Sequence, residues 1–199
     1  MNGQSDVRIV RSTIDVKQWL HRGPPSVDVA RPAHCPGCGV ASRPLGDGLV
    51  LHGHGLRART VIVRAKDRSV LREILARRYV CRACDAVALV MPADVARRCL
   101  YTLSVIAAAL AAWSCGGMPA RAVRSSFSAF TIVGVATTGW MSLTRWSRAA
   151  TLLWPRLGAM TGGHPRSVAG RVASRLSAFA PVPSGHLPDD AIAGAVHAA

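Results

Sequence analysis

Four cysteines carry the clearest chemistry in the sequence. Cys35 and Cys38 lie in a C-P-G-C-G turn, and Cys81 and Cys84 lie in R-Y-V-C-R-A-C. Each C-x2-C spacing lets one tight turn point two sulfurs at the same ion, and four thiolates match a closed tetrahedral zinc site. The sequence therefore predicts one structural Zn²⁺ that is bound by Cys35, Cys38, Cys81 and Cys84.

Other uses of these cysteines are less well supported. A redox C-x-x-C motif is expected within a βαβ unit, and no such pattern surrounds either pair. Two disulfides remain the alternative, but a disulfide framework is typical of secreted chains. The first apolar runs are short and interrupted by charged residues, so no signal peptide is expected and the protein is expected to be cytoplasmic. His34, His52 and His54 are interpreted as loop residues, because four cysteines already complete a site.

The chain has a large excess of positive charge. Its 25 Lys and Arg residues stand against 10 Asp and Glu residues, which gives a formal net charge of +15. Lys17 and Lys66 are the only lysines, so arginine dominates. Arginine favours bidentate contacts with phosphates and guanine edges, although a bias in genomic base composition also enriches it. A polyanionic partner is therefore predicted.

Residues 1–96 are predicted to form a small zinc-ribbon-like antiparallel β module. Aliphatic and β-branched residues indicate strands over 7–10, 49–51, 60–63 and the end of 71–80, the last stretch being ambiguous between strand and helix. A short helix is expected over 13–20. With the helices that follow, the predicted fold class is α+β.

Residues 97–160 are predicted to form a helix-turn-helix bundle. Apolar residues at helical spacing indicate helices over 101–113, 120–127 and 138–154, the third with Thr138 as its N-cap. In the third helix, Leu143 and Trp146 fall on the face that packs, whereas Arg145 and Arg148 lie mostly elsewhere. This division is expected of a helix that presents polar residues to a DNA groove.

Residues 161–199 are predicted to be a partly disordered tail. One helix is expected over 167–179, where apolar residues recur at helical spacing. The alanine-rich stretch after Asp189 and Asp190 is expected to be a marginal helix, because it is too short to be stable without docking.

Two uncharged segments require that a membrane location be considered. Residues 99–120 contain no charge over 22 positions, and residues 125–144 contain none over 20. Both lengths could cross a bilayer. Their many Ala, Ser, Gly and Thr residues offset the aliphatic gain on insertion, so buried helices of a small bundle explain them better. Cys99 and Cys115 are then interpreted as small core residues.

The order of the motifs resembles a known family. C-P-G-C-G, then R-R-Y-V-C-R-A-C, then M-P with a pair of arginines, an alanine-rich helix and G-W-M-S-L-T-R-W look like the N-terminal half of insertion-sequence transposases. They also resemble short bacterial proteins built from the same zinc-binding and helix-turn-helix parts. The resemblance covers about residues 7–154. It implies recognition of the DNA ends of a mobile element, metal roles for the four cysteines and a recognition helix around Arg145.

The sequence lacks the acids that a transposase uses to cut DNA. Such enzymes hold two metal ions with a carboxylate trio, and two-metal phosphoryl chemistry needs those acids. From Val95 through Pro188 the sequence contains no Asp or Glu. We therefore expect a protein that is not an enzyme.

The expected partner is duplex DNA, with a separate recombinase or a second copy of the chain as further candidates and no membrane. Arginines would contact phosphates, and the third helix would read base edges in the major groove. The residues expected to contact DNA are Arg57, Arg59, Arg64, Lys66, Arg121, Arg124, Ser142, Thr144, Arg145 and Arg148. Two alternatives remain: a zinc-ribbon module that binds RNA or protein, and a membrane protein with a cytosolic zinc module.

Overall fold

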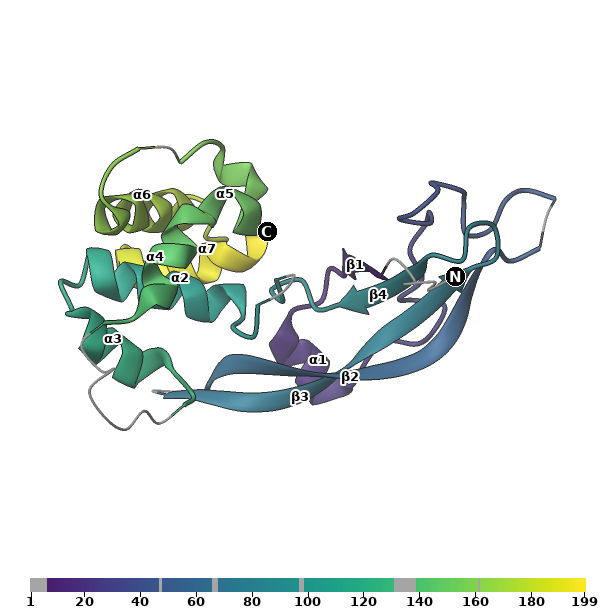
Figure 1. Ribbon diagram of the computed structural model, residues 1–199, viewed down its shortest axis with the longest axis horizontal. Coiled ribbons are helices and arrows are strands. Elements are labelled where there is room, and N and C mark those ends of the chain that lie inside the picture. Colours follow the sequence, from purple (N-terminus) through teal and green to yellow (C-terminus); the bar gives the residue numbers. More distant parts are fainter. Residues whose placement is uncertain (1–6, 47, 66–67, 97–98, 131–138, 161) are drawn as a thin grey trace, which may run out of the picture. The chain divides into compact units, whose positions relative to one another are not determined.

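The computed structural model describes residues 7–46, 48–65, 68–96, 99–130, 139–160 and 162–199. Within this part of the chain the fold is mixed α+β, with one four-stranded sheet and seven α-helices (Figure 1). The chain divides into two compact units. We call Met1–Thr60 with Glu73–Arg97 the sheet unit, and Val61–Arg72 with Arg98–Ala199 the helical unit. Each is described by itself.

The sheet has the strand order β1-β4-β3-β2. Its strands are β1 (Val7–Arg11), β2 (Leu51–Ala65), β3 (Arg68–Cys81) and β4 (Val87–Met91). β3 pairs with β4 in the antiparallel sense, whereas β1 pairs with β4 in parallel. The sheet is therefore mixed, in contrast to the antiparallel sheet predicted from the sequence. A parallel pair needs a long connection, and nearly all of the sheet unit separates β1 from β4 along the chain.

The second strand is much longer than predicted. The strand expected over 60–63 lies inside a 15-residue strand, β2, which begins at Leu51, the last residue of the stretch expected over 49–51. Gly53 and Gly55, which separate the two expected stretches, both lie inside β2, and Gly55 has a φ of 82°. The strand continues through both glycines beside its neighbour β3, although Gly55 lies in the left-handed region. A glycine inside a strand often marks a local distortion of the ladder. The ambiguous stretch over 71–80 is strand throughout.

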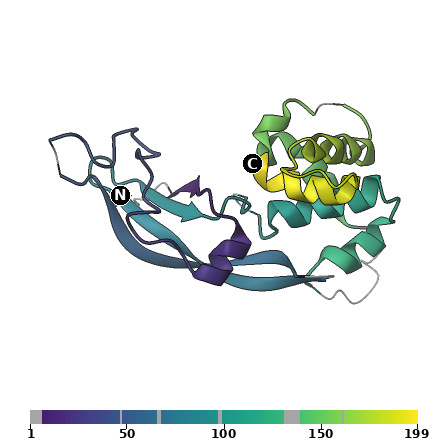
Figure 2. The same cartoon turned by 180° about the vertical axis from the view of Figure 1, so that it is seen from behind.

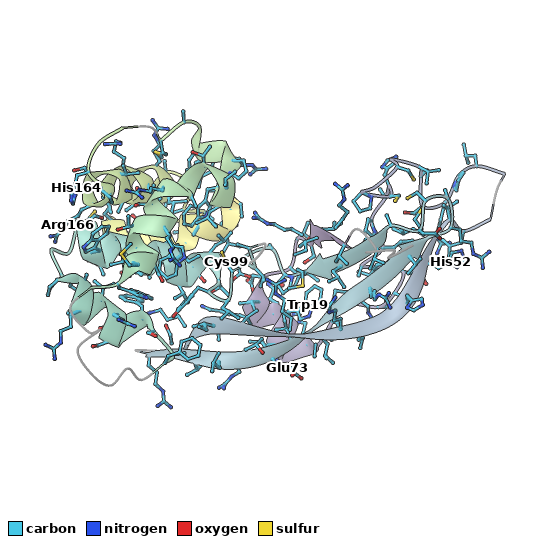
Figure 3. The ribbon with its side chains drawn as sticks, in the orientation of Figure 1. Trp19, His52, Glu73, Cys99, His164 and Arg166 are labelled. Atoms are coloured by element: carbon cyan, nitrogen blue, oxygen red, sulfur yellow. The ribbon has the colours of Figure 1, made fainter. Side chains whose placement is uncertain are left out.

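A short helix packs against the sheet. The helix α1 (Val16–Arg22) begins at Asp15, whose carboxylate accepts a hydrogen bond from the Gln18 N–H at 2.8 Å. Trp19 is 2% exposed, and its Nε1 donates to the Leu75 carbonyl at 3.1 Å (Figure 3). This indole joins α1 to β3 and is part of the core of the sheet unit.

The helical unit is built around α2. Its helices are α2 (Leu103–Ser114), α3 (Ala120–Phe127), α4 (Met141–Arg148), α5 (Ala150–Leu153), α6 (Pro165–Ser177) and α7 (Leu187–His197). Both α6 and α7 lie along α2 and against each other (Figure 2). At Gly194 of α7, a Cβ atom would lie 1.8 Å from the Leu176 carbonyl oxygen of α6, so only glycine allows this close approach.

Two differences from the sequence prediction concern helices. The helix expected over 138–154 is divided into α4 and α5, because Ala149 has φ −88° and ψ 7° and interrupts the regular turn. Thr138, its expected N-cap, lies outside the described residues. The expected tail contains two packed helices, α6 and α7. The final helix is stabilised by docking, since Trp154 Nε1 donates to the Ala195 carbonyl at 3.0 Å.

The outer part of the β2–β3 pair belongs to the helical unit. Ile62 N–H donates to the Leu100 carbonyl at 2.6 Å, and Thr102 N–H donates to the Ile62 carbonyl at 3.0 Å. The boundary predicted near residue 97 places this segment in the N-terminal module, whereas it belongs to the helical unit. The sequence does not reveal a backbone pairing between residues so far apart along the chain.

In the described part of the chain, no helix has both the length and the apolar character needed to cross a bilayer. The uncharged stretch over 99–120 contributes α2, which has 12 residues. Its side chains from Val105 to Ala111 are buried within the helical unit. Packing against neighbouring helices accounts for this apolar sequence.

Candidate metal centre and basic surface

The first cysteine pair lies in a tight turn, which we call the first knuckle (residues 35–40). Cys35 N–H donates to the Val40 carbonyl at 2.8 Å, and Gly39 N–H donates to the Cys35 carbonyl at 2.9 Å. Gly39 has a φ of 76°, which glycine adopts without strain. At Gly37 a Cβ atom would lie 2.7 Å from the Cβ of Ala86, so the turn packs closely against the second pair.

The second cysteine pair repeats this backbone (the second knuckle, residues 81–86). Cys81 N–H donates to the Ala86 carbonyl at 3.1 Å, and Asp85 N–H donates to the Cys81 carbonyl at 2.9 Å. Asp85 has a φ of 57° and occupies the position equivalent to Gly39. Aspartate tolerates the left-handed region better than most residues, so the two turns match although their sequences differ. Sequence inspection did not reveal this equivalence.

The two knuckles bring four sulfurs together. The Sγ atoms of Cys35, Cys38, Cys81 and Cys84 all lie within 4.8 Å of one another. Cys35 and Cys84 are 3.7 Å apart, and Cys38 and Cys81 are 3.8 Å apart. An ion about 2.3 Å from each of four tetrahedral ligands separates neighbouring sulfurs by about 3.8 Å. The distances fit a four-thiolate metal site, and they exceed the roughly 2.05 Å of a disulfide bond.

Close packing alters the acidity of the thiols. Burial tends to raise the pKa of Cys35, but hydrogen bonds from the Cys38 N–H and its neighbours outweigh it and lower that pKa to about 7. Burial raises the pKa of Cys81. The Ala86 N–H tends to lower the pKa of Cys84, but the Cys38 thiol and burial raise it to about 12. Four thiolates at this spacing repel one another, so a cation is needed to hold all of them deprotonated.

The histidines lie outside this cluster, as predicted. Within the described residues, the four cysteines are the one group of three or more side chains placed to bind a metal. His52 lies in β2, where its Nε2 atom contacts the Leu49 carbonyl oxygen (Figure 3). His54 lies in the same strand, and its Nδ1 is 2.8 Å from a guanidinium nitrogen of Arg78. The strand position of both histidines differs from the loop interpretation.

Four of the arginines expected to contact DNA are exposed. They are Arg57 on β2, Arg121 on α3, and Arg145 and Arg148 on α4. Ser142 and Thr144 are half-buried on α4. These exposed guanidinium groups are accessible to a polyanion.

Three other arginines on that list make contacts within the protein. Arg59 donates to the Ala96 carbonyl at 3.3 Å. The Arg64 guanidinium lies 4.7 Å from the centre of the Phe127 ring, a cation–π geometry. Arg124 donates to the Gly139 carbonyl at 3.1 Å. Lys66 lies outside the described residues. Their positions in the sequence do not show that these arginines make internal contacts while the others are exposed.

The helix α4 has the two-sided character predicted from its sequence. Trp140, Leu143 and Trp146 are buried, whereas Arg145 and Arg148 are exposed. The Trp140 and Trp146 rings meet edge to face with centroids 4.9 Å apart. The aromatic pair thus holds α4 in the helical unit while its last turn presents two arginines.

The helix-turn-helix prediction itself is not confirmed. The turn of that motif has about 3–4 residues, whereas α3 ends at Phe127 and α4 begins at Met141. The shorter described connection joins α2 to α3 and contains Gly117, whose φ is 68°. No protein-family model, curated protein or solved structure matches the chain.

Proposed function

We propose that the protein is a non-catalytic, zinc-containing protein that binds duplex DNA. The observation that carries the proposal is the set of exposed arginines, Arg121, Arg145 and Arg148, on a helical unit whose sequence has no acid between Val95 and Pro188. Helices that present several cations without compensating carboxylates favour a polyanionic ligand. The lack of acids in that segment also leaves no carboxylate trio for metal-dependent DNA cleavage.

Zinc is the metal that we assign to the four-cysteine cluster. Cys35, Cys38, Cys81 and Cys84 would occupy all four positions, so no position remains for substrate and the role is structural. The ion would supply folding free energy to the sheet unit by joining the two knuckles. The same donors also suit iron, and elemental analysis of the purified protein distinguishes the two metals.

The exposed arginines are the proposed DNA contacts. Arg57 would bind phosphates from the sheet unit, and Arg121 would do so from α3. Arg145 and Arg148, in the last turn of α4, would contact phosphates or base edges, with Ser142 and Thr144 beside them. Arg59, Arg64 and Arg124 would act by stabilising the fold that presents these groups.

The motifs that resemble insertion-sequence transposases favour recognition of the ends of a mobile element. A protein without its own nuclease chemistry would then act with a separate recombinase or with a second copy of itself. Regulation of transcription uses the same kind of binding, and the recovered DNA sequence would distinguish the two roles.

Selection of the purified protein against random duplex DNA tests the proposal. A recovered motif is expected, and with about six phosphate contacts the logarithm of affinity should fall with the logarithm of salt concentration with a slope of roughly −5. Structured RNA should compete poorly. Preference for RNA over duplex DNA, or affinity that does not change with salt, would contradict DNA binding.

Two matched variants locate the contact. Arg145→Gln should weaken binding to the selected duplex by about tenfold or more, since a charge-assisted bidentate contact contributes about 1–3 kcal/mol. Arg22→Gln removes one exposed positive charge from α1 and should leave affinity nearly unchanged. Equal affinities for the two variants would exclude α4 from the interface.

A further inference from the structure

The sheet unit contains a pocket of about 310 Å³. Each of the four strands contributes at least one residue to its lining. The lining residues are Val7, His54, Leu56, Arg57, Arg78 and Val87. Small-molecule sites in proteins typically occupy about 300–1,000 Å³, so this pocket can take a small ligand.

The register of the sheet explains how these residues meet. Arg78 of β3 pairs with Leu89 of β4, and Val7 of β1 pairs with Val87 of β4. Because side chains two residues apart share a face, Arg78, Val87 and Val7 lie on the same face of the sheet. On the opposite face, Tyr79 donates to the Val27 carbonyl at 2.6 Å and is buried beneath that segment.

The polar side of the pocket presents donors. An arginine side chain only donates, so at 2.8 Å from Arg78 Nη1 the His54 Nδ1 must be the acceptor. The imidazole proton is then on Nε2, which becomes a donor. Arg57 adds a second, exposed guanidinium. Among the described residues that line the pocket, none is acidic.

The pocket lining also contains aliphatic residues. Val7, Leu56 and Val87 contribute aliphatic residues to the lining that also includes Arg57 and Arg78. Leu56 is 44% exposed, so a ligand that covers it would remove apolar surface from water. Two cations beside an aliphatic wall suit an anion that is attached to a small organic group.

We propose that this pocket binds a phosphate group carried by a small organic moiety. Arg57 and Arg78 would contact the phosphate oxygens, with His54 Nε2 as a further donor. The organic group attached to the phosphate, such as the sugar of a nucleotide, would contact Val7, Leu56 and Val87. A free phosphomonoester and a phosphate of a DNA strand offer the same chemistry. The site includes Arg57, already proposed as a DNA contact, and adds Arg78 and His54 to it.

Calorimetric titration of the full chain in phosphate-free buffer tests this site. Adenosine monophosphate should bind with a saturable isotherm and more tightly than inorganic phosphate, because only the nucleotide reaches the aliphatic wall. Arg57→Gln and Arg78→Gln should each weaken nucleotide binding by about tenfold or more, as expected for loss of a charge-assisted contact. Arg22→Gln should bind as the unchanged protein does.

A further variant distinguishes loss of the binding site from loss of the fold. Leu56→Glu replaces an exposed side chain at the pocket and places a carboxylate there, so it should abolish nucleotide binding while the melting temperature stays the same. Absence of saturable binding to either phosphate compound, or equal losses in Arg22→Gln and Arg57→Gln, would overturn the proposal.

A competition experiment identifies the source of the phosphate. If adenosine monophosphate displaces duplex DNA, the site holds a strand phosphate; if it binds without affecting DNA, the ligand is a free phosphomonoester. If the nucleotide binds and duplex DNA does not, the proposed DNA-binding function fails while the phosphate site stands.

Discussion

Asp94 is a carboxylate held away from water. It is 2% exposed, and its Oδ1 accepts a hydrogen bond from Val16 N–H at 2.8 Å, at the first turn of α1. Burial raises its pKa to about 6, because the charged form loses hydration that the backbone N–H groups of Val16 and of Asp94 itself do not replace. The folded protein therefore retains a proton on Asp94 between about pH 4 and pH 6 that the unfolded chain releases.

Replacing this carboxyl should stabilise the protein at neutral pH. Since the folded pKa is raised, the free energy of unfolding falls as pH rises from 4 to 6, by about 3 kcal/mol at about 1.4 kcal/mol per pKa unit. Asp94→Asn keeps an acceptor for Val16 N–H and removes the charge. We expect the variant to be more stable above pH 6 by up to that amount and similar below pH 4, as measured by denaturant unfolding.

The variant must be compared with the unchanged protein at each pH, because another acid changes the stability with pH in the opposite direction. The Ser184 backbone N–H and hydroxyl hold the pKa of Asp190 below its usual range, so this group loses stabilisation as the solution becomes acidic. Only the difference between Asp94→Asn and the unchanged protein isolates Asp94. A difference that is the same at pH 4 and pH 8 would contradict the burial explanation.

Gly37 controls how closely the knuckles approach. A Cβ at this position would lie 2.7 Å from the Cβ of Ala86 and 3.3 Å from the Cys84 sulfur. Gly37→Ala should therefore spread the sulfurs and reduce metal affinity at least about tenfold, which competition with a chromophoric chelator measures. Gly48→Ala is the control, because a Cβ there meets no atom within 4 Å. Unchanged affinity in Gly37→Ala would show that the knuckles can separate without loss.

At the scale of elements, different residues of α4 contribute to stability and to the proposed DNA contact. Trp146 is 8% exposed, and its ring lies 5.0 Å from the Tyr101 ring. Trp146→Ala should reduce the free energy of unfolding by about 3–5 kcal/mol, whereas Arg145→Ala should leave the melting curve nearly unchanged. Thermal unfolding of both variants measures this contrast. Similar melting temperatures for the two would show that the indole contributes little packing.

Sequence patterns predicted elements better than their boundaries and partners. Residues 120–127 were predicted as a helix and form α3 over the same range, because Pro119 and the apolar spacing act locally. The long strand β2, which contains Gly53 and Gly55, was not predicted as one strand, since its pairing with a neighbouring strand is not visible in the sequence. Docking of α7 was missed for the same reason: it depends on Gly194 meeting Leu176.

The candidate sites show the same limit. The cysteine cluster was predicted from two spacings, because each C-x2-C fixes its own turn. The pocket with His54, Arg57 and Arg78 was not, since its residues meet only through the register of strands distant in sequence. The sequence also does not distinguish Arg64, which lies over the Phe127 ring, from Arg57, which is exposed.

For the whole molecule, two compact units predict an uneven response to metal removal. A strong chelator, or Cys81→Ser, should unfold the sheet unit, where the knuckles are joined through the ion. Most of the helical circular-dichroism signal should remain, because six of the seven described helices lie in the helical unit. The change in tryptophan fluorescence reports the loss, because Trp19 is the one of the five tryptophans that lies in the sheet unit. Adding Zn²⁺ should restore it in the chelated protein. An unchanged fluorescence spectrum in chelator would refute a structural metal.

The pairing of Ile62 with Leu100 and Thr102 determines the order in which these segments can fold during synthesis. The segment Val61–Arg72 leaves the ribosome before any helix of the unit to which it belongs. Synthesis proceeds at about 5–20 residues per second, so Ile62 waits a few seconds for Leu100 and Thr102 to follow it. During that interval the segment's apolar residues Val61, Ile62 and Val63 lack their final neighbours, and the nascent chain has a defined window in which a chaperone could hold it.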